Sequence, residues 1–247
     1  MTESKDGANI GKPQNADDYE KATRYKLIEY CAGGNSNTCL AFLANYCSTR
    51  FYPRRLDFNA YSVKEHPTED LSALTPLTAA CGLTLTGSFA RRSEEDKRLE
   101  IVKKLLQYHT DPNFQPTGSS FWNTPLMIAA WIGYEKITEL LLRYGAAINC
   151  SDRHNSTALI YAAGQGHKKI VEQLLEAGAD PEIINSRGWS AIHYAVAKAY
   201  IGIIRILMKK QGITPEELGL IEKSVFQKTN VKIVSPTIVQ NTYPAPG

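Results

Sequence analysis

A repeat with a period of about 33 residues constrains the fold of this chain more than any other feature. Thr124 opens the segment Thr-Pro-Leu-Met-Ile-Ala-Ala-Trp-Ile-Gly, Thr157 opens a similar segment one period later, and Ser190 opens a third after the same interval. A fixed period of this length is typical of a stacked array, in which each unit contacts only its neighbours. We therefore expect one elongated array rather than two globular domains.

Each unit is predicted to contain two helices joined by a tight turn. Thr124 can cap the first helix through its hydroxyl, and Pro125 follows at the first helical position, where a missing N–H costs nothing. Gly133 lies at the turn, Ile137 begins the apolar stripe of the second helix, and Gly145 suits the left-handed conformation that ends it. The same pattern in the neighbouring units predicts an all-α solenoid of stacked helix pairs.

The first clear unit carries an insertion. The interval from Thr75 to Ile101 is twice as long as the corresponding interval from Thr124 to Ile137 in the next unit. The extra residues lie around Thr84–Arg98, and their charged side chains are expected to face solvent, with a contact to a specific partner as the alternative. His109 and Ala199 depart from the pattern, because each stands where the repeat has glycine.

The pattern divides the chain into one repeat domain and two flanking segments. Residues 1–17 are polar and predicted to be disordered, and 230–247 is predicted to be a flexible tail, whose apolar part at Val231–Gln240 could dock on a partner or on the array. The domain, 18–229, is predicted to contain a degenerate N-terminal cap at 18–59, repeats at 75–113, 123–149, 156–182 and 189–212, and a capping helix at 214–229. Thr214 and Glu217 form a capping box at the start of that helix.

The segment that Thr124 opens, with the Leu-Leu-X-X-Gly-Ala that follows it, resembles the ankyrin repeat. The resemblance is strongest over Asn123–Asp180 and looser elsewhere, and only His193 keeps the histidine of the motif. It implies antiparallel helix pairs joined by hairpin-like loops that project sideways. It also implies a non-catalytic module that binds another protein on the surface formed by those loops and the first helices.

Large side chains at the variable positions of the first helices and loops predict the binding site. These positions face the concave groove in the family that the chain resembles, and they hold all three tryptophans. Tryptophan, tyrosine and arginine dominate interface hot spots, so Trp131 and Trp189 are the main candidates. The alternative is that some of these side chains pack against neighbouring repeats or loops. The predicted partner-binding residues are Trp122, Ile128, Trp131, Ile132, Arg153, His154, Tyr161, Gln165, Arg187, Trp189, Tyr194 and Lys198.

The sequence contains no sign of catalysis, a metal or a cofactor. It has no phosphate-binding loop, nucleophile elbow or HExxH motif. Cys31, Cys39 and Cys47 are spaced by eight without a histidine at ligand spacing, so we expect core residues rather than zinc ligands. We predict that the chain is not an enzyme; a site hidden in the insertion and the caps is the alternative.

Charge and cysteine content limit the remaining classes of function. A net charge of +3 is too balanced to predict nucleic-acid binding, and we expect neither a membrane span nor a secretory signal. Five cysteines without a CxxC pair favour a reducing compartment, the cytoplasm. We predict a monomeric module that binds a protein partner. The alternatives are a regulatory array that occludes an enzyme or a transcription factor, and an effector or adaptor that an intracellular microbe delivers into the host cytoplasm or nucleus.

Overall fold

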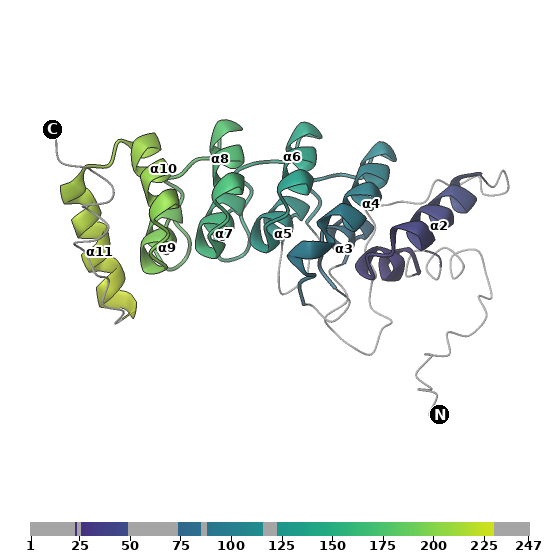
Figure 1. Ribbon diagram of the computed structural model, residues 1–247, viewed down its shortest axis with the longest axis horizontal. Coiled ribbons are helices and arrows are strands. Elements are labelled where there is room, and N and C mark those ends of the chain that lie inside the picture. Colours follow the sequence, from purple (N-terminus) through teal and green to yellow (C-terminus); the bar gives the residue numbers. More distant parts are fainter. Residues whose placement is uncertain (1–22, 24–25, 49–73, 85–87, 116–122, 230–247) are drawn as a thin grey trace, which may run out of the picture.

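Helix pairs stack side by side in the order of the sequence, as the repeat predicts (Figure 1). The computed structural model describes residues 23, 26–48, 74–84, 88–115 and 123–229. The predicted disorder at 1–17, the predicted tail at 230–247 and Trp122 lie outside these residues. The helix pairs are α3 (Pro76–Ala80) with α4 (Glu95–Gln107), α5 (Pro125–Ile132) with α6 (Glu135–Arg143), α7 (Ala158–Gln165) with α8 (Lys168–Glu176), and α9 (Ala191–Ala197) with α10 (Ile201–Gln211).

The predicted capping residues begin and end these helices. The hydroxyl of Thr124 accepts a hydrogen bond from the backbone N–H of Met127 at 3.3 Å, and Thr157 caps α7 in the same way. Gly133 ends α5 with a φ of 94°, a left-handed conformation that the Cβ of other residues makes unfavourable. The sequence pattern therefore sets the length of each inner helix.

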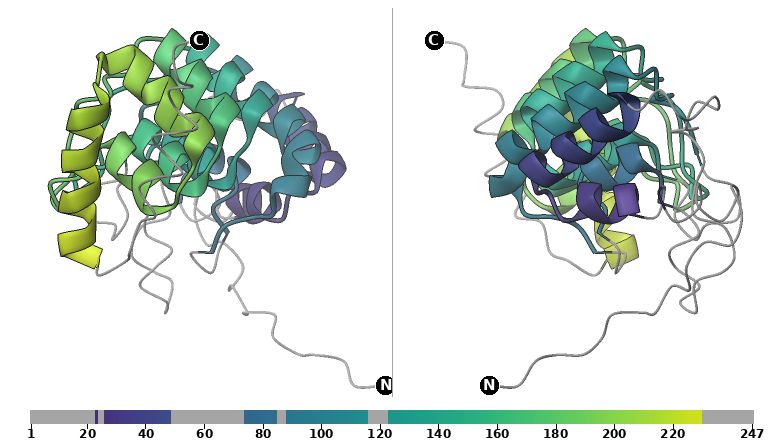
Figure 2. Two further views of the ribbon diagram at one scale, coloured as in Figure 1. Left: turned by 60° about the vertical axis from the view of Figure 1, so that its left-hand side comes forward. Right: turned by 90° about the vertical axis from the view of Figure 1, so that its right-hand side faces the viewer.

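The inner and outer helices form two layers. The inner helices α5, α7 and α9 pack in a row, and each outer helix packs on the inner helix of its own pair. Alanines such as Ala129 and Ala162 are fully buried, which allows the inner helices to approach closely. The loops that join α6 to α7 and α8 to α9 lie along one side of the row (Figure 2).

Two further helical elements close the ends of the array. At the N-terminal end, residues 26–32 are helical and precede α2 (Ser36–Ser48), with the thiols of Cys31 and Cys39 3.5 Å apart in the core. Both are free thiols, and burial raises the pKa of Cys31. The side chain of Cys47 is not among those described. At the other end, the hydroxyl of Thr214 caps α11 (Pro215–Thr229).

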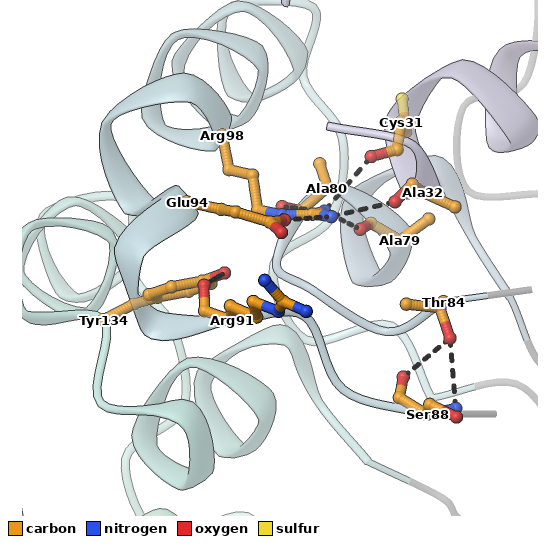
Figure 3. Close-up of polar contacts among 10 residues, drawn as sticks. All are labelled: Cys31, Ala32, Ala79, Ala80, Thr84, Ser88, Arg91, Glu94, Arg98 and Tyr134. Atoms are coloured by element: carbon orange, nitrogen blue, oxygen red, sulfur yellow. Dashed lines mark hydrogen bonds and ion pairs between the residues drawn. The ribbon is translucent and has the colours of Figure 1, made fainter. Parts of the chain in front are cut away.

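The insertion forms a loop that covers the end of the next unit. Leu83 and Phe89 form an antiparallel bridge, and a turn of 3-10 helix, η2 (Arg92–Glu94), leads into α4. The hydroxyl of Tyr134, at the start of the second outer helix, donates to the carbonyl of Arg91 at 2.9 Å (Figure 3). The loop therefore packs on the turn between α5 and α6.

The expectation that the charged side chains of the insertion face solvent is wrong for Arg98. Its side chain is only 2% exposed, because α4 directs it between the last turn of the 26–32 helix and the last turn of α3 (Figure 3). The guanidinium donates to the carboxylate of Glu94 at 3.1 Å and to four backbone carbonyls, those of Cys31, Ala32, Ala79 and Ala80. Arg98 thus joins the N-terminal cap to the first repeat.

The other charges near the start of α4 bridge neighbouring outer helices. The carboxylate of Glu95 accepts from the backbone N–H groups of Lys136 and Ile137, so it caps α6 from the adjacent repeat. Asp96 pairs with Lys136 at 2.6 Å, and Arg92 pairs with Glu135 at 2.7 Å. The charge run therefore contributes contacts between repeats.

The two positions that lack the expected glycine have left-handed backbones. His109 has a φ of 59° and Ala199 a φ of 54°. Because a Cβ destabilises this conformation by about 1–2 kcal/mol, His109→Gly and Ala199→Gly are each expected to raise the free energy of unfolding by about 1 kcal/mol in urea denaturation. Ala177→Gly is the control, since Ala177 has a φ of −77°; it should lower stability by roughly 0.5–1 kcal/mol. Equal effects at Ala199 and Ala177 would contradict the prediction.

Candidate functional site

A pocket of about 180 Å³ opens on the inner-helix side of the array, and we call it the aromatic pocket. It lies where α5, α7, the loop before α7 and the insertion meet. Most of its wall is apolar, with Ile128 and Met127 buried at its base and the polar side chains on the loop side. The residues that line it are Phe89, Asn123, Met127, Ile128, Trp131, Asp152, Arg153, His154 and Tyr161.

Three aromatic rings from three parts of the chain form the pocket wall. Trp131 lies on the last turn of α5 and is 36% exposed. It stacks on Phe89 of the insertion, with ring centroids 5.5 Å apart, and meets Tyr161 of α7 edge-on at 5.2 Å. Such pairs fix ring orientation, so the tryptophan is held in place while more than a third of its surface stays open to solvent.

A buried carboxylate fixes the loop beside the pocket. One oxygen of Asp152 accepts the backbone N–H groups of His154 and Ser156, both at 2.8 Å. Its other oxygen accepts the hydroxyl hydrogen of Tyr161, and burial together with this bond raises the pKa of Tyr161 far above its ordinary value. The Tyr161 hydroxyl therefore braces the hairpin, whereas its ring lines the pocket.

The next hairpin repeats this arrangement with an amide. The side-chain oxygen of Asn185 accepts the backbone N–H groups of Arg187 and Trp189, and its NH₂ group donates to the hydroxyl of Tyr194 at 2.8 Å. Tyr194 therefore packs against the loop that precedes its repeat, and its part in partner binding stays a prediction.

Six predicted binding residues are exposed and three are buried. The exposed ones are Trp131, Arg153, His154, Gln165, Arg187 and Lys198. The buried ones are Ile128 at 1%, Ile132 at 8% and Trp189 at 7% relative exposure. Those three have little surface left for a partner, although Ile128 still forms part of the pocket base.

Ile132 and Trp189 are buried for separate physical reasons. Ile132 packs against the turn that follows α3, because a Cβ added at Gly82 would lie 2.5 Å from its Cδ1. Trp189 packs edge-on against Tyr194 with ring centroids 5.0 Å apart and stacks on His193 at 6.5 Å. The prediction that Trp189 faces the groove is therefore wrong.

The predicted set lacks four residues that line the pocket: Phe89, Asn123, Met127 and Asp152. Phe89 lies in the insertion, which has no register in the repeat, so no positional rule assigned it to the groove. Asp152 stands one repeat period before Asn185. Both are residue types whose side chains accept hydrogen bonds from the backbone N–H groups of a turn, so their recurrence at this spacing could have indicated the role of Asp152 from the sequence.

The closest contact between a serine and a histidine in the described chain is structural. The hydroxyl of Ser190 lies 3.0 Å from Nδ1 of His193, and the backbone N–H of Ser190 donates to the same nitrogen. This is the capping box that begins α9. Burial, with a smaller contribution from the positive charge of Lys228, lowers the pKa of His193. A catalytic pair would also need a third group that orients the imidazole, and the described residues supply none.

Membrane spans and metal sites are two other kinds of feature that the described part of the chain could hold. None of its helices combines the length and apolar character that crossing a bilayer requires. No group of three or more histidine, cysteine, aspartate and glutamate side chains lies close enough together there to hold a metal ion.

Comparison with known proteins identifies the repeats. Residues 90–185 match the family model for ankyrin repeats in three copies, a range that covers α4 to α8 and nearly all of the aromatic pocket. No curated protein matches the chain. With the stacked helix pairs, the Thr and Gly caps and the braced hairpins, this match shows that the chain contains ankyrin repeats.

Proposed function

We propose that this protein binds a protein partner on its inner-helix side and that the aromatic pocket receives one partner side chain. Ankyrin repeats are generally protein–protein interaction modules. The observation that carries the more specific proposal is Trp131, which is exposed beside a pocket with a mostly apolar wall. Exposed apolar surface of this kind marks interaction sites, and tryptophan is the side chain most enriched at hot spots.

The size of the pocket favours a side chain over a small molecule. Pockets that enclose small-molecule ligands measure about 300–1,000 Å³. The aromatic pocket, at about 180 Å³, is smaller than this range. It is close to the roughly 150 Å³ cavity that holds one benzene molecule in an engineered protein core. One phenyl or branched aliphatic side chain would fill it.

The Trp131→Ala variant tests the proposal. Losing a hot-spot tryptophan costs about 2 kcal/mol or more, so affinity for the partner should fall about 30-fold. Immobilised wild-type and variant chains would be compared for the proteins that each captures from cell extract, with quantitative mass spectrometry as the readout. Isothermal titration with the purified partner would then give the change in affinity.

Tyr144→Ala provides the matched control. Tyr144 is 43% exposed at the end of the outer helix α6, so its removal deletes a similar ring away from the pocket. Capture should be lost with Trp131→Ala and retained with Tyr144→Ala, while both variants melt within a few degrees of the wild type. Equal capture by all three chains would rule out the aromatic pocket as the binding site.

A further inference from the structure

The ion pairs of the described residues are confined to one side of the array. They involve side chains from η2 and the outer helices α4, α6 and α8: Arg92–Glu135, Arg98–Glu94, Lys136–Asp96, Arg143–Glu139, Lys168–Glu172 and Lys169–Glu135. The inner-helix side has a different charge pattern. Its helices α3, α5, α7 and α9 contain no aspartate or glutamate.

The charges on the inner-helix side are positive and without an ionic partner. Arg153 and Arg187 lie in successive hairpins, and Lys198 follows α9; all three are exposed. None of them forms an ion pair within the described chain. Lys228 of α11 extends this row, since its ammonium donates to the carbonyl of Arg187 at 2.9 Å.

The acidic groups described near these cations do not form ion pairs with them. Asp152 is buried, and its oxygens already accept hydrogen bonds, one from backbone N–H groups of its own hairpin and the other from the hydroxyl of Tyr161 on α7. Asp180 and Glu182 lie at the opposite end of the next hairpin, where the adjoining Pro181 carbonyl accepts from Gln211 at the end of α10. Among the described residues, Arg153 therefore lies at the rim of the aromatic pocket and Arg187 in the next hairpin, and neither forms an ion pair with a carboxylate.

We infer that the partner presents an acidic segment with a single apolar anchor, an inference that rests on the proposed function. The anchor side chain fills the aromatic pocket, and flanking carboxylates pair with Arg153 and Arg187. Arginine forms bidentate bonds with carboxylates, so this pairing also fixes the direction of the bound segment. Packed helices lie roughly 10 Å apart, which is the distance between successive hairpins. A peptide in the polyproline II conformation covers that distance in about three residues, which is also one full turn, so acidic residues about three positions apart share a face and match the two arginines.

A nucleic acid fits these observations less well than an acidic peptide. Proteins that bind nucleic acid through its backbone typically neutralise about 6–10 phosphates. The described inner-helix side has a short row of cations beside a pocket that holds a single ring. We therefore place single-stranded RNA among the outcomes of the test.

The test selects peptides without assuming a partner. A random dodecapeptide phage library would be panned on the full-length wild-type chain, and selected peptides would be synthesised and measured by fluorescence anisotropy. We expect sequences with one aromatic or long aliphatic residue flanked by aspartate or glutamate. Their affinity should fall about tenfold or more with Arg153→Glu and with Arg187→Glu, and it should weaken as salt is raised.

Control variants separate this inference from the proposed function. Arg205→Glu makes the same charge change on the outer helix α10, where Arg205 is exposed, and should leave affinity within about twofold. Peptides that lose binding with Trp131→Ala but are not acidic and tolerate Arg153→Glu would overturn the acidic segment and leave the proposed function intact. Failure to select any peptide, or equal binding to Trp131→Ala, would overturn both. If a twelve-nucleotide single-stranded RNA binds more tightly than the selected peptides, and Arg153→Glu abolishes that binding, the partner is a nucleic acid and not an acidic peptide.

Discussion

Replacing Arg98 with methionine is expected to lower the free energy of unfolding by about 3–5 kcal/mol. Arg98 is almost fully buried, and its guanidinium bonds to backbone carbonyls at the ends of two helices. The last carbonyls of a helix have no partner within it, so removal of the guanidinium leaves them buried and unsatisfied. Methionine fills a similar volume without donors, so the variant isolates the hydrogen bonds from the packing.

Lys103→Met is the control for this substitution. Lys103 is exposed on the same helix, so its change to methionine should alter stability by less than about 0.5 kcal/mol. Urea denaturation followed by circular dichroism would measure both. Equal midpoints for Arg98→Met and wild type would show that the guanidinium does not stabilise the contact between the cap and the first repeat.

The loss should be local, because repeat arrays unfold through contacts between neighbours. Hydrogen exchange should show residues 26–48 losing protection first in Arg98→Met, while α7–α9 keep theirs. The protection of residues 26–48 in Arg98→Lys should lie between that in wild type and that in Arg98→Met. A single ammonium cannot reach all the carbonyls that the guanidinium joins. Uniform loss of protection along the whole chain would contradict this account.

The helix pairs could be predicted because the residues that specify them act locally. A threonine that caps a helix, a proline after it and a glycine at the turn each impose one backbone conformation wherever they occur. Thr124, Thr157 and Gly133 perform in the structure the roles that their positions indicate. Because the units are evenly spaced, the same local conformations recur along the array.

Arg98 could not be recognised from the charge run around it, because burial of a guanidinium depends on distant carbonyls. Its partners Cys31 and Ala79 lie 67 and 19 residues away in sequence. One signal was present. Arg98 stands three and seven residues before Ile101 and Leu105, so helical periodicity places it on the buried face of α4.

The pocket was predicted in part, and the errors follow from register. Trp131 occupies a variable position that faces outward, and the structure exposes it. Trp189 stands immediately before its capping serine, and the equivalent Ser156 in the preceding unit is also buried. That position packs at the base of the hairpin in both units, so residue type alone was misleading. Phe89 reaches the pocket only through the fold of the insertion.

Gly133→Ala is expected to destabilise the array by about 2–5 kcal/mol and to weaken partner binding. Gly133 has a φ of 94°, where a Cβ adds about 1–2 kcal/mol of strain. The new methyl group would also lie 2.6 Å from Cε1 of His167, and such overpacking costs about 1–3 kcal/mol. The imidazole must then move, although its Nε2 is 3.0 Å from the carbonyl oxygen of Trp131. Displacement of that ring would disturb the last turn of α5 and with it the aromatic pocket.

Gly145→Ala separates the backbone strain from the steric clash. Gly145 has a φ of 79°, but nothing lies within 4 Å of an added Cβ, so only the backbone strain of about 1–2 kcal/mol should appear. In a double-mutant cycle, His167→Ala should remove the steric part of the Gly133→Ala effect and leave the strain. Urea denaturation of the four chains in the cycle, with Gly145→Ala beside them, gives both contributions. Equal losses at Gly133 and Gly145 would mean that the imidazole moves freely, and the pocket should then bind its partner unchanged in Gly133→Ala.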